Sequence, residues 1–282
     1  MGTVFKIRSK QVLGPDLKLM DIEAPEIAVK AQPGQFIILR IDDSGERIPL
    51  TVADFDRQQG IITIIFQEVG RTTRDLGLLE AGDELLDFVG PLGKESDIEK
   101  FGKVVCVGGG VGIAPVYPIT RALHEEGNEI VSIIGARCAE ALILEDEMNK
   151  VSDRLIIVTD DGSRGDKGFV TDPLRELLKN EKIDRVVAIG PLPMMQAVSE
   201  LTKEFGVHTV VSMNTIMVDG TGMCGACRVQ VGKDTMFACV DGPEFDGHLV
   251  DWNLARQRAK MFLSQEKAAM AGHGGGCSCQ KK

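Results

Sequence analysis

The stretch Val104-Val-Cys-Val-Gly108-Gly-Gly-Val-Gly112-Ile-Ala-Pro115 decides the fold class of this chain. A short, wholly apolar run such as Val104–Val107 is typical of a parallel strand buried on both faces of a sheet. The glycines after it form a tight turn, and a helical pattern then continues through His124. Such a turn exposes backbone N–H groups to a phosphate, although its spacing is not the G-x-G-x-x-G fingerprint and a plain strand–helix turn also selects glycine. The stretch therefore predicts a parallel α/β unit with a candidate nucleotide site.

The chain beyond this turn continues to alternate between strand and helix patterns. We expect strands at Glu129–Ile134, Leu155–Thr159, Val186–Ile189 and Thr209–Met213, and helices at Glu140–Lys150, Thr171–Asn180 and Pro193–Phe205. This order is typical of a doubly wound α/β domain. Two further glycine-bearing loops follow strands, at Asp160-Asp-Gly162 and Gly190-Pro-Leu-Pro-Met194. Because ligands of open α/β sheets bind beyond the carboxyl ends of the strands, we expect all three loops to form one nucleotide pocket.

The residues before Lys103 have an all-β pattern. Alternating runs separated by Gly, Pro and Asp turns predict an antiparallel barrel or sandwich, with strands at Val4–Arg8, Asp16–Asp21, Gln35–Ile41, Ile48–Ala53, Gly60–Gln67 and Glu84–Val89. Arg47-Ile-Pro-Leu-Thr51 offers a guanidinium and a hydroxyl to a diphosphate or an isoalloxazine edge. Gly70-Arg-Thr-Thr73, at the start of a helical turn, offers donors to phosphate. Taken alone, each stretch is more often a solvated strand or a helix cap.

A third pattern lies in Asp219-Gly-Thr-Gly-Met-Cys224-Gly-Ala-Cys227, which Cys239 follows. The spacing is that of the Cys-x4-Cys-x2-Cys…Cys ferredoxin loop, with Asp219 in place of the first cysteine. A carboxylate carries the same single negative charge as a thiolate, so we expect a 2Fe–2S cluster held by Asp219, Cys224, Cys227 and Cys239. A structural zinc and three unrelated thiols are the alternatives. The fourth ligand could also be another group, such as Cys277 or Cys279.

Composition narrows the class of protein. The 282 residues hold 32 Lys and Arg against 42 Asp and Glu, a net charge of −10, which disfavours binding to nucleic acid or an anionic membrane. The start of the chain lacks an apolar signal region, and the run Val104–Ile119 is too short and too glycine-rich to span a bilayer. Seven cysteines in such a chain are expected as thiols or metal ligands. We therefore expect a cytoplasmic protein.

Over residues 3–255 the chain resembles the ferredoxin-reductase-type flavoproteins. Within them it is similar to the electron-transfer subunits of dihydroorotate dehydrogenase and to the small subunits of NADH-dependent ferredoxin:NADP⁺ oxidoreductases. The stretches that carry the resemblance are Ile48–Thr51, Val69–Thr73, Gly90–Gly93, Gly108–Pro115, Asp160–Gly162, Gly190–Met195 and Phe237–Pro243. The resemblance implies FAD on the barrel, NAD(H) on the α/β domain and a 2Fe–2S cluster in the C-terminal segment.

The resemblance also implies the cofactor-binding residues. For FAD they are Arg47, Pro49, Leu50, Thr51, Gln67, Gly70, Thr72 and Thr73. For NAD(H) they are Gly109, Gly110, Gly112, Ile113, Ala114, Pro115, Asp160, Asp161, Gly162, Gly190, Pro191 and Met194. The family often has arginine directly before the proline, where this chain has Ile48, and a shift of one residue turns Arg47 to the other face of a strand. No catalytic acid or base is expected, because hydride transfer between nicotinamide and flavin needs orientation rather than proton transfer.

These expectations divide the chain into four parts. They are a FAD-binding barrel at 1–98, an NAD(H)-binding domain at 99–212, a cluster segment at 213–250, and a terminal helix with a loose tail at 251–282. The charged run Arg256–Lys260 is expected on a surface or subunit-contact face.

The implied function is electron transfer from NADH through FAD and the cluster to a partner. The partner is expected to be a larger flavin and iron–sulfur subunit that handles NADP(H) and ferredoxin, with electron bifurcation as a further step. One alternative is an electron-transfer subunit of dihydroorotate dehydrogenase. The other is a non-catalytic subunit whose nucleotide site senses rather than reacts.

Overall fold

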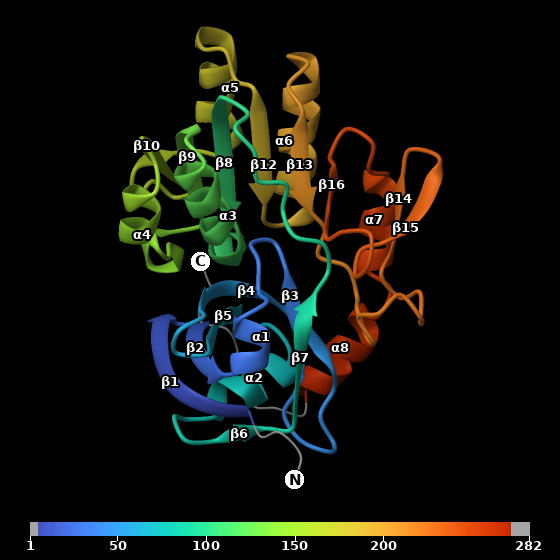
Figure 1. The fold of residues 1–282 in the computed structure, drawn as a ribbon. Helices are drawn as coiled ribbons and strands as arrows, with labels where there is room; N and C mark the ends of the chain where they lie inside the picture. Colours follow the sequence, from blue (N-terminus) through green and yellow to red (C-terminus); the bar gives the residue numbers. More distant parts are fainter. Residues whose placement is uncertain (1–4, 272–282) are drawn as a thin grey trace.

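The computed structural model describes residues 5–271, which form a β-barrel, a parallel α/β sheet and a small C-terminal segment (Figure 1). The barrel and the α/β sheet lie one above the other in this view, and the C-terminal segment lies along the side of both. Among the described residues, no helix is long and apolar enough to cross a membrane.

The barrel is built from seven strands in the order β6-β1-β2-β5-β4-β3-β7. Their bounds are β1 (Phe5–Gly14), β2 (Leu17–Glu23), β3 (Phe36–Arg40), β4 (Ile48–Asp56), β5 (Ile61–Gln67), β6 (Glu84–Leu85) and β7 (Asp87–Leu92). Only Leu86 separates β6 from β7, the two ends of this order, so the sheet closes almost completely on itself. Buried Leu39, Ile64, Phe66 and Phe88 fill its interior. The predicted antiparallel barrel is confirmed, with two short helices added, α1 (Pro25–Ala28) and α2 (Arg71–Leu78).

The barrel keeps one open stretch of strand edge. The first half of β4, Ile48–Thr51, pairs with β3, but β4 pairs with β5 only from Val52 onward. Helix α2 follows β5, beyond the short link Glu68–Gly70. A strand edge without a partner offers backbone N–H and C=O groups to a ligand.

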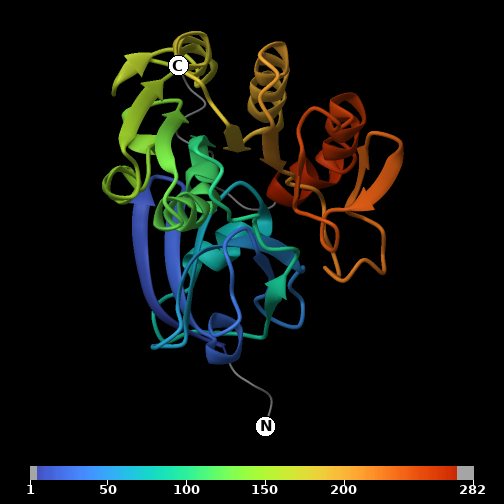
Figure 2. The same cartoon turned by 45° about the horizontal axis from the view of Figure 1, so that its top comes forward.

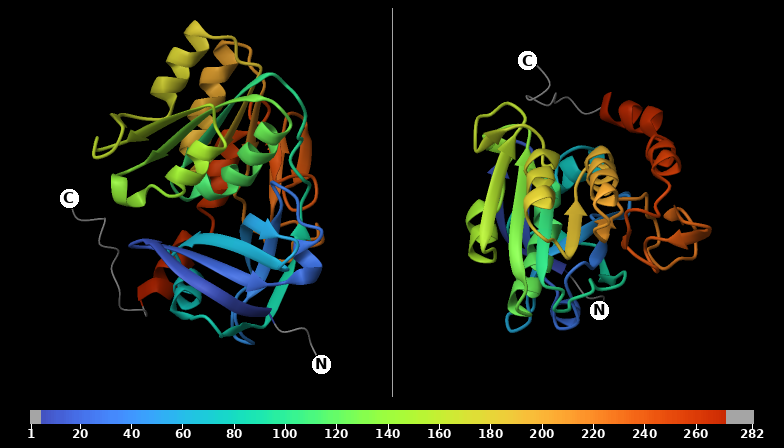
Figure 3. Two further views of the ribbon diagram at one scale, coloured as in Figure 1. Left: turned by 60° about the vertical axis from the view of Figure 1, so that its left-hand side comes forward. Right: turned by 90° about the horizontal axis from the view of Figure 1, so that it is seen from above.

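The second sheet is parallel except for its last strand, and its order is β11-β10-β9-β8-β12-β13-β16. Its strands are β8 (Lys103–Gly109), β9 (Glu129–Ala136), β10 (Arg154–Thr159), β11 (Asp166–Lys167), β12 (Arg185–Ile189), β13 (Thr209–Ser212) and β16 (Glu244–Asp246). The helices are α3 (Ile113–Glu125), α4 (Glu145–Lys150), α5 (Thr171–Asn180) and α6 (Leu192–Glu204), with 3₁₀ turns η1 (Gly110–Gly112) and η2 (Ala139–Ala141). Helices α3 and α4 cover one face and α5 and α6 the other (Figures 2 and 3), which confirms the doubly wound α/β prediction.

The C-terminal segment begins with a loop and the hairpin β14 (Arg228–Val231) and β15 (Asp234–Phe237). Strand β16 then pairs antiparallel with β13 at the edge of the α/β sheet. The predicted cluster segment is thus hydrogen-bonded to the sheet of the predicted nucleotide domain.

Two predicted helices differ from those observed. The helix expected at Glu140–Lys150 begins only at Glu145, because Leu144 before it has left-handed backbone dihedrals (φ 55°) that end the preceding turn. The helix expected at Asp251–Ala271 is two helices, α7 (Trp252–Ala259) and α8 (Leu263–Ala271). The chain breaks between them because α7 packs on α6 and β14, whereas α8 reaches α2 of the barrel. The predicted tail at 272–282 lies outside the described residues.

Candidate cofactor sites

Two of the three glycine loops meet at the switch point of the α/β sheet. The chain leaves β8 toward β9 and β10 and later returns to β12 on the other side of β8. The loops after β8 and β12 are in contact, since a Cβ on Gly112 would lie 2.4 Å from the carbonyl oxygen of Ile189. A Cβ on Gly109 would likewise lie 2.3 Å from Sδ of Met194. Only glycine permits this approach, and the crevice at such a switch point is where open α/β sheets bind nucleotides.

The third loop lies apart from this crevice. It follows β10, and β9 stands between β10 and β8. The backbone of Asp160 and Asp161 bonds to the end of β9, at Ala136 and Arg137. Hydrogen bonds from Ser163 hold the pKa of the exposed Asp161 carboxyl below its ordinary value. The structure therefore brings the loops after β8 and β12 together, as predicted. The prediction that all three loops form one pocket is wrong, because Asp160–Gly162 lies at the far end of the same sheet edge.

The glycine turn also faces the barrel. Helix α3 packs on β4, and η1 lies against β5. The guanidinium of Arg121 on α3 donates two hydrogen bonds to the carboxylate of Asp54 on β4, at 2.7 and 3.1 Å. These bonds raise the pKa of Arg121 above its ordinary value. Residues Ile113, Ala114 and Pro115 form the first turn of α3, so the predicted nucleotide residues stand next to the barrel.

The predicted FAD residues gather around the open edge of β4. Pro49, Leu50 and Thr51 are half-buried on that edge. At the start of α2, Thr73 Oγ1 accepts a hydrogen bond from the Gly70 N–H at 3.0 Å. Thr72 Oγ1 donates to Glu46 Oε2 at 3.2 Å, which ties α2 to the loop before β4.

Two residues of the predicted FAD set are less well placed. Arg47 is exposed and its guanidinium lies 3.6 Å from the carboxylate of Asp87 on β7. Gln67 is exposed at the end of β5, where it pairs with Leu17 of β2 rather than with β4.

The four predicted iron ligands form two pairs. Cys224 Sγ lies 3.0 Å from Asp219 Oδ1, and Cys227 Sγ lies 3.2 Å from Cys239 Sγ. Within residues 5–271, no three His, Cys, Asp or Glu side chains converge on a single ion. Two pairs of ligands match a centre that contains two metal ions.

Backbone N–H groups of the loop already point at these ligands. The Gly222 N–H donates to Cys239 Sγ at 3.2 Å, and the Met223 N–H donates to Asp219 Oδ2 at 3.1 Å. The hydrogen bond from the Cys224 thiol holds the pKa of the Asp219 carboxyl well below its ordinary value. Burial, then the neighbouring Cys227 thiol, raises the pKa of Cys239 to about 12. Because only the thiolate binds iron, metal binding must release that proton.

The ligand loop packs directly on the barrel. A Cβ on Gly220 would lie 2.6 Å from Cδ1 of Ile38 on β3 and 2.9 Å from Cδ1 of Leu92 on β7. No sequence pattern indicates this contact. It places the residue after Asp219 against the strand that pairs with the open edge of β4.

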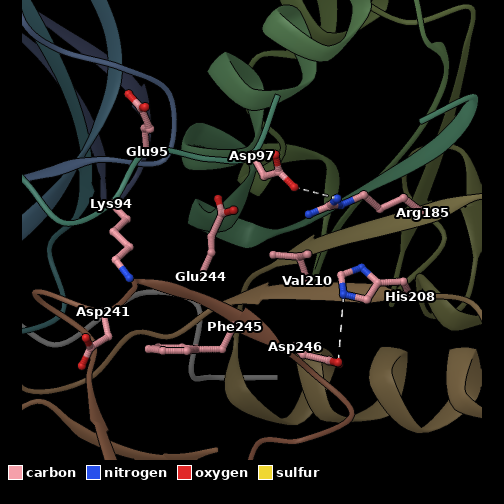
Figure 4. Close-up of a pocket in the computed structure, with 10 residues that line it drawn as sticks. All are labelled: Lys94, Glu95, Asp97, Arg185, His208, Val210, Asp241, Glu244, Phe245 and Asp246. Carbon is pink, nitrogen blue, oxygen red and sulfur yellow. Dashed lines mark hydrogen bonds and ion pairs between the residues drawn. The ribbon is translucent and has the colours of Figure 1, made fainter. Parts of the chain in front are cut away.

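A cavity of about 240 Å³ lies elsewhere, between the link from β7 to β8 and the N-terminal ends of β12 and β13 (Figure 4). Glu244 of β16 and Asp97 of the link project toward it. Glu244 accepts a hydrogen bond from Ser96 Oγ at 2.5 Å, and burial raises the pKa of this carboxyl. None of the predicted cofactor residues lines this cavity.

Comparisons with known proteins match two parts of the chain. Residues 106–200 match the oxidoreductase NAD-binding domain, and residues 214–251 match the iron–sulfur cluster binding domain of dihydroorotate dehydrogenase B. A relative from Thermotoga maritima, a dihydroorotate dehydrogenase B (NAD(+)) electron transfer subunit homolog, is 50% identical over 267 residues, 94% of each chain. The chain belongs to the family of dihydroorotate dehydrogenase B electron-transfer subunits and their homologues.

Two solved structures are similar to this electron-transfer subunit. It is similar to a chain of the NADH-dependent reduced ferredoxin–NADP oxidoreductase, with 46% identity, a TM-score of 0.91, and coverage of 96% of this chain and 98% of that one. A ferredoxin NADP⁺ reductase from Neisseria gonorrhoeae shares the fold alone, with 20% identity, a TM-score of 0.58, and coverage of 72% and 91%. The predicted NAD-binding and iron–sulfur parts of an oxidoreductase subunit are thereby confirmed.

Proposed function

We propose that this subunit passes electrons between NAD(H), FAD and a 2Fe–2S cluster, and onward to a larger flavin and iron–sulfur subunit. The observation that carries the proposal is the pairing of Asp219 with Cys224 and of Cys227 with Cys239 in a loop that packs on the barrel. When bound, NAD(H) and FAD supply two-electron chemistry and the cluster supplies one-electron chemistry.

The nucleotide would bind at the crevice between β8 and β12. Glycines 109, 110, 112 and 190 leave its floor free of side chains, and the N-terminus of the thirteen-residue helix α3 favours a phosphate. Asp160–Gly162 would bind a more distant part of the dinucleotide, because this loop lies two strands from the crevice. Because α3 packs on β4, the nicotinamide end would lie on the barrel side of the crevice.

FAD would bind at the open edge of β4. Ile48–Thr51 pair with β3 but not with β5, so their free side offers backbone groups there. Arg71–Thr73 in the first turn of α2 offer N–H donors to the diphosphate. Arg47 contributes only if it leaves Asp87, which its exposed position allows.

The cluster would take one ligand pair on each iron. Asp219 and Cys224 would hold the iron nearer the surface, because Cys224 is exposed whereas Cys227 and Cys239 are buried. The backbone donors of Gly222 and Met223 would stabilise the negative charge of the ligand set. The buried pair would thus hold the inner iron of the centre and the more exposed pair its outer iron.

The exposed end of the ligand loop supports the proposal of a partner subunit. Three apolar side chains surround it, with Met223 exposed by 88%, Val218 by 51% and Val240 by 43%. An apolar rim around a redox centre suits a docked protein that receives or delivers single electrons. We propose that the partner handles NADP(H) and ferredoxin, with bifurcation between them.

A second candidate is the electron-transfer subunit of a dihydroorotate dehydrogenase. The match of residues 214–251 to the cluster domain of that enzyme favours it. The partner that co-purifies decides between the two, by oxidising dihydroorotate or by reducing NADP⁺ and ferredoxin.

The proposed function is tested by anaerobic absorption and EPR spectroscopy of the purified chain, with iron, sulfide and flavin counted. We expect one FAD and two irons per chain, bleaching by NADH and a rhombic one-electron EPR signal. Zinc in place of iron, or a protein without flavin, would exclude the redox function.

A further inference from the structure

Helix α7 lies beside the ligand loop and outside the matched cluster domain, which ends at residue 251. Asp251 begins this helix, and its carboxylate accepts a hydrogen bond from the Leu254 N–H at 2.9 Å. The Asp251 N–H donates to Gln230 O of β14, and Trp252 Nε1 donates to Gly247 O at 3.0 Å. The start of α7 is therefore fixed on the cluster segment.

Three residues of α7 lie on the helix face that is turned toward the cluster segment. Trp252, Ala255 and Arg258 follow each other at steps of three and are all half-buried, and the first two pack against the core. Arg256 and Gln257 lie on the exposed face. Arg258 is thus held next to the cluster segment, in a run that the sequence predicted as a surface or subunit-contact face.

The guanidinium of Arg258 binds the ligand loop itself. Its Nη2 donates to the carbonyl oxygen of Ala226 at 2.9 Å, and Ala226 stands between the ligands Cys224 and Cys227. No carboxylate among residues 5–271 pairs with Arg258. A second guanidinium lies close by, since a Cβ on Gly225 would be 3.0 Å from Nη1 of Arg228. Two positive charges therefore flank the Cys224–Cys227 turn in a chain whose net charge is −10.

We propose that Arg258 is a positioning residue that holds the Cys224–Cys227 turn in its ligating shape and raises the reduction potential of the cluster. This inference rests on the proposed 2Fe–2S site. The bond to Ala226 O fixes the peptide that leads into Cys227 and polarises it, which strengthens its N–H as a donor. The unpaired positive charge favours the reduced centre, which is more negative by one charge than the oxidised one.

The test compares four purified chains with their clusters in place. They are the wild type, Arg258→Gln, Arg258→Lys and the control Arg256→Gln. Arg256 lies on the same helix, but among the described residues its guanidinium hydrogen-bonds to Asn253 Oδ1 alone, at 2.7 Å. Iron and sulfide are counted, and the one-electron EPR signal is followed in a potentiometric titration.

We expect Arg258→Gln to lower the ratio of reduced to oxidised cluster at the wild-type midpoint by roughly three- to tenfold, as removal of one partly solvated charge should. For a one-electron couple a tenfold change is about 59 mV. Arg258→Lys keeps the charge and should restore most of the potential, and Arg256→Gln should match the wild type. If Arg258→Gln loses iron while Arg256→Gln keeps it, the result supports the role of Arg258 in holding the loop. The midpoint potential of Arg258→Lys then tests the effect of the charge.

The proposal is overturned if Arg258→Gln keeps its iron and has the same midpoint as Arg256→Gln. A wild-type chain that contains no iron would instead overturn the proposed function. The two failures are therefore distinguishable.

Discussion

Arg121 of α3 and Asp54 of β4 are joined by two parallel hydrogen bonds, 2.7 Å from Nη2 to Oδ1 and 3.1 Å from Nη1 to Oδ2. A bidentate pair of this kind sets direction as well as distance. It ties the helix that follows the glycine turn to the strand whose other half forms the open edge. This ion pair is thus one of the contacts that set the distance between the two proposed cofactor sites, beside the apolar packing of α3 on the barrel.

Replacement of Arg121 by Met should slow flavin reduction by NADH roughly tenfold or more, since a misplacement of ~1 Å between reacting groups can cost about a hundredfold. The loss of stability should stay near about 1 kcal/mol or less, because both side chains are partly exposed. Stopped-flow absorption measures the rate and chemical denaturation the stability. Arg175→Met, which breaks the exposed pair with Glu204, is the matched control and should change neither. A wild-type rate in Arg121→Met would show that the junction does not orient the nucleotide.

Replacement of Asp219 by Cys tests the fourth ligand. Thiolate is a softer ligand than carboxylate, so the cluster should persist at two irons per chain with a changed visible spectrum and potential. Cys227→Ala should lose the cluster, because it breaks a buried ligand pair. Asp234→Cys places a thiol in the hairpin of the same segment and should leave the spectrum unchanged. If Asp219→Cys is also spectroscopically silent, Asp219 is a bystander.

His248 should make stability depend on pH. Burial lowers the pKa of this imidazole below its ordinary value of 6.5, and its Nε2 lies 3.0 Å from Thr202 Oγ1. A histidine whose folded pKa is depressed binds more protons when unfolded, so stability is full above the unfolded pKa and is lost as the pH falls through it. Denaturation between about pH 5 and 8 should show a smaller loss in His248→Gln than in the wild type. His124 is exposed, so His124→Gln is the control. An identical pH dependence of stability in all three proteins would contradict this role of His248.

Local patterns were enough to predict most of the fold. The apolar run Val104–Val107 with its glycine turn, and the period-two runs before Lys103, depend on neighbours in the chain, so their strands and helices are read directly from the residues. The helix at 251–271 was predicted as one piece because its break is set by two distant partners, α6 and α2. The pairing of β16 with β13 is likewise invisible in a three-residue strand.

The candidate site was likewise predicted in part from local patterns. Ligand spacing predicted Asp219, Cys224, Cys227 and Cys239, and the structure brings them together as two pairs. The glycine loops predicted one pocket, but strand order separates Asp160–Gly162 from the other two. No sequence signal marked Arg121, and Arg258 was predicted only as part of a surface or subunit-contact run. Each acts through a contact with a residue 67 or 32 positions away, which local patterns do not reveal.

The contact of Gly220 with Ile38 and Leu92 should control electron transfer between barrel and cluster. A Cβ there would lie 2.6 and 2.9 Å from these side chains, and the left-handed backbone (φ 76°) resists any other residue. Gly220→Ala should therefore push the loop outward, so that NADH bleaches the flavin at the wild-type rate while the cluster is reduced more slowly. Gly232→Ala is the control, because it has the same kind of backbone (φ 59°) and nothing within 4 Å. Both variants should lose about 1–2 kcal/mol from backbone strain, and only Gly220→Ala should separate the two rates in stopped-flow absorption. Equal slowing of cluster reduction in both variants would mean that strain, and not distance from the barrel, limits the transfer.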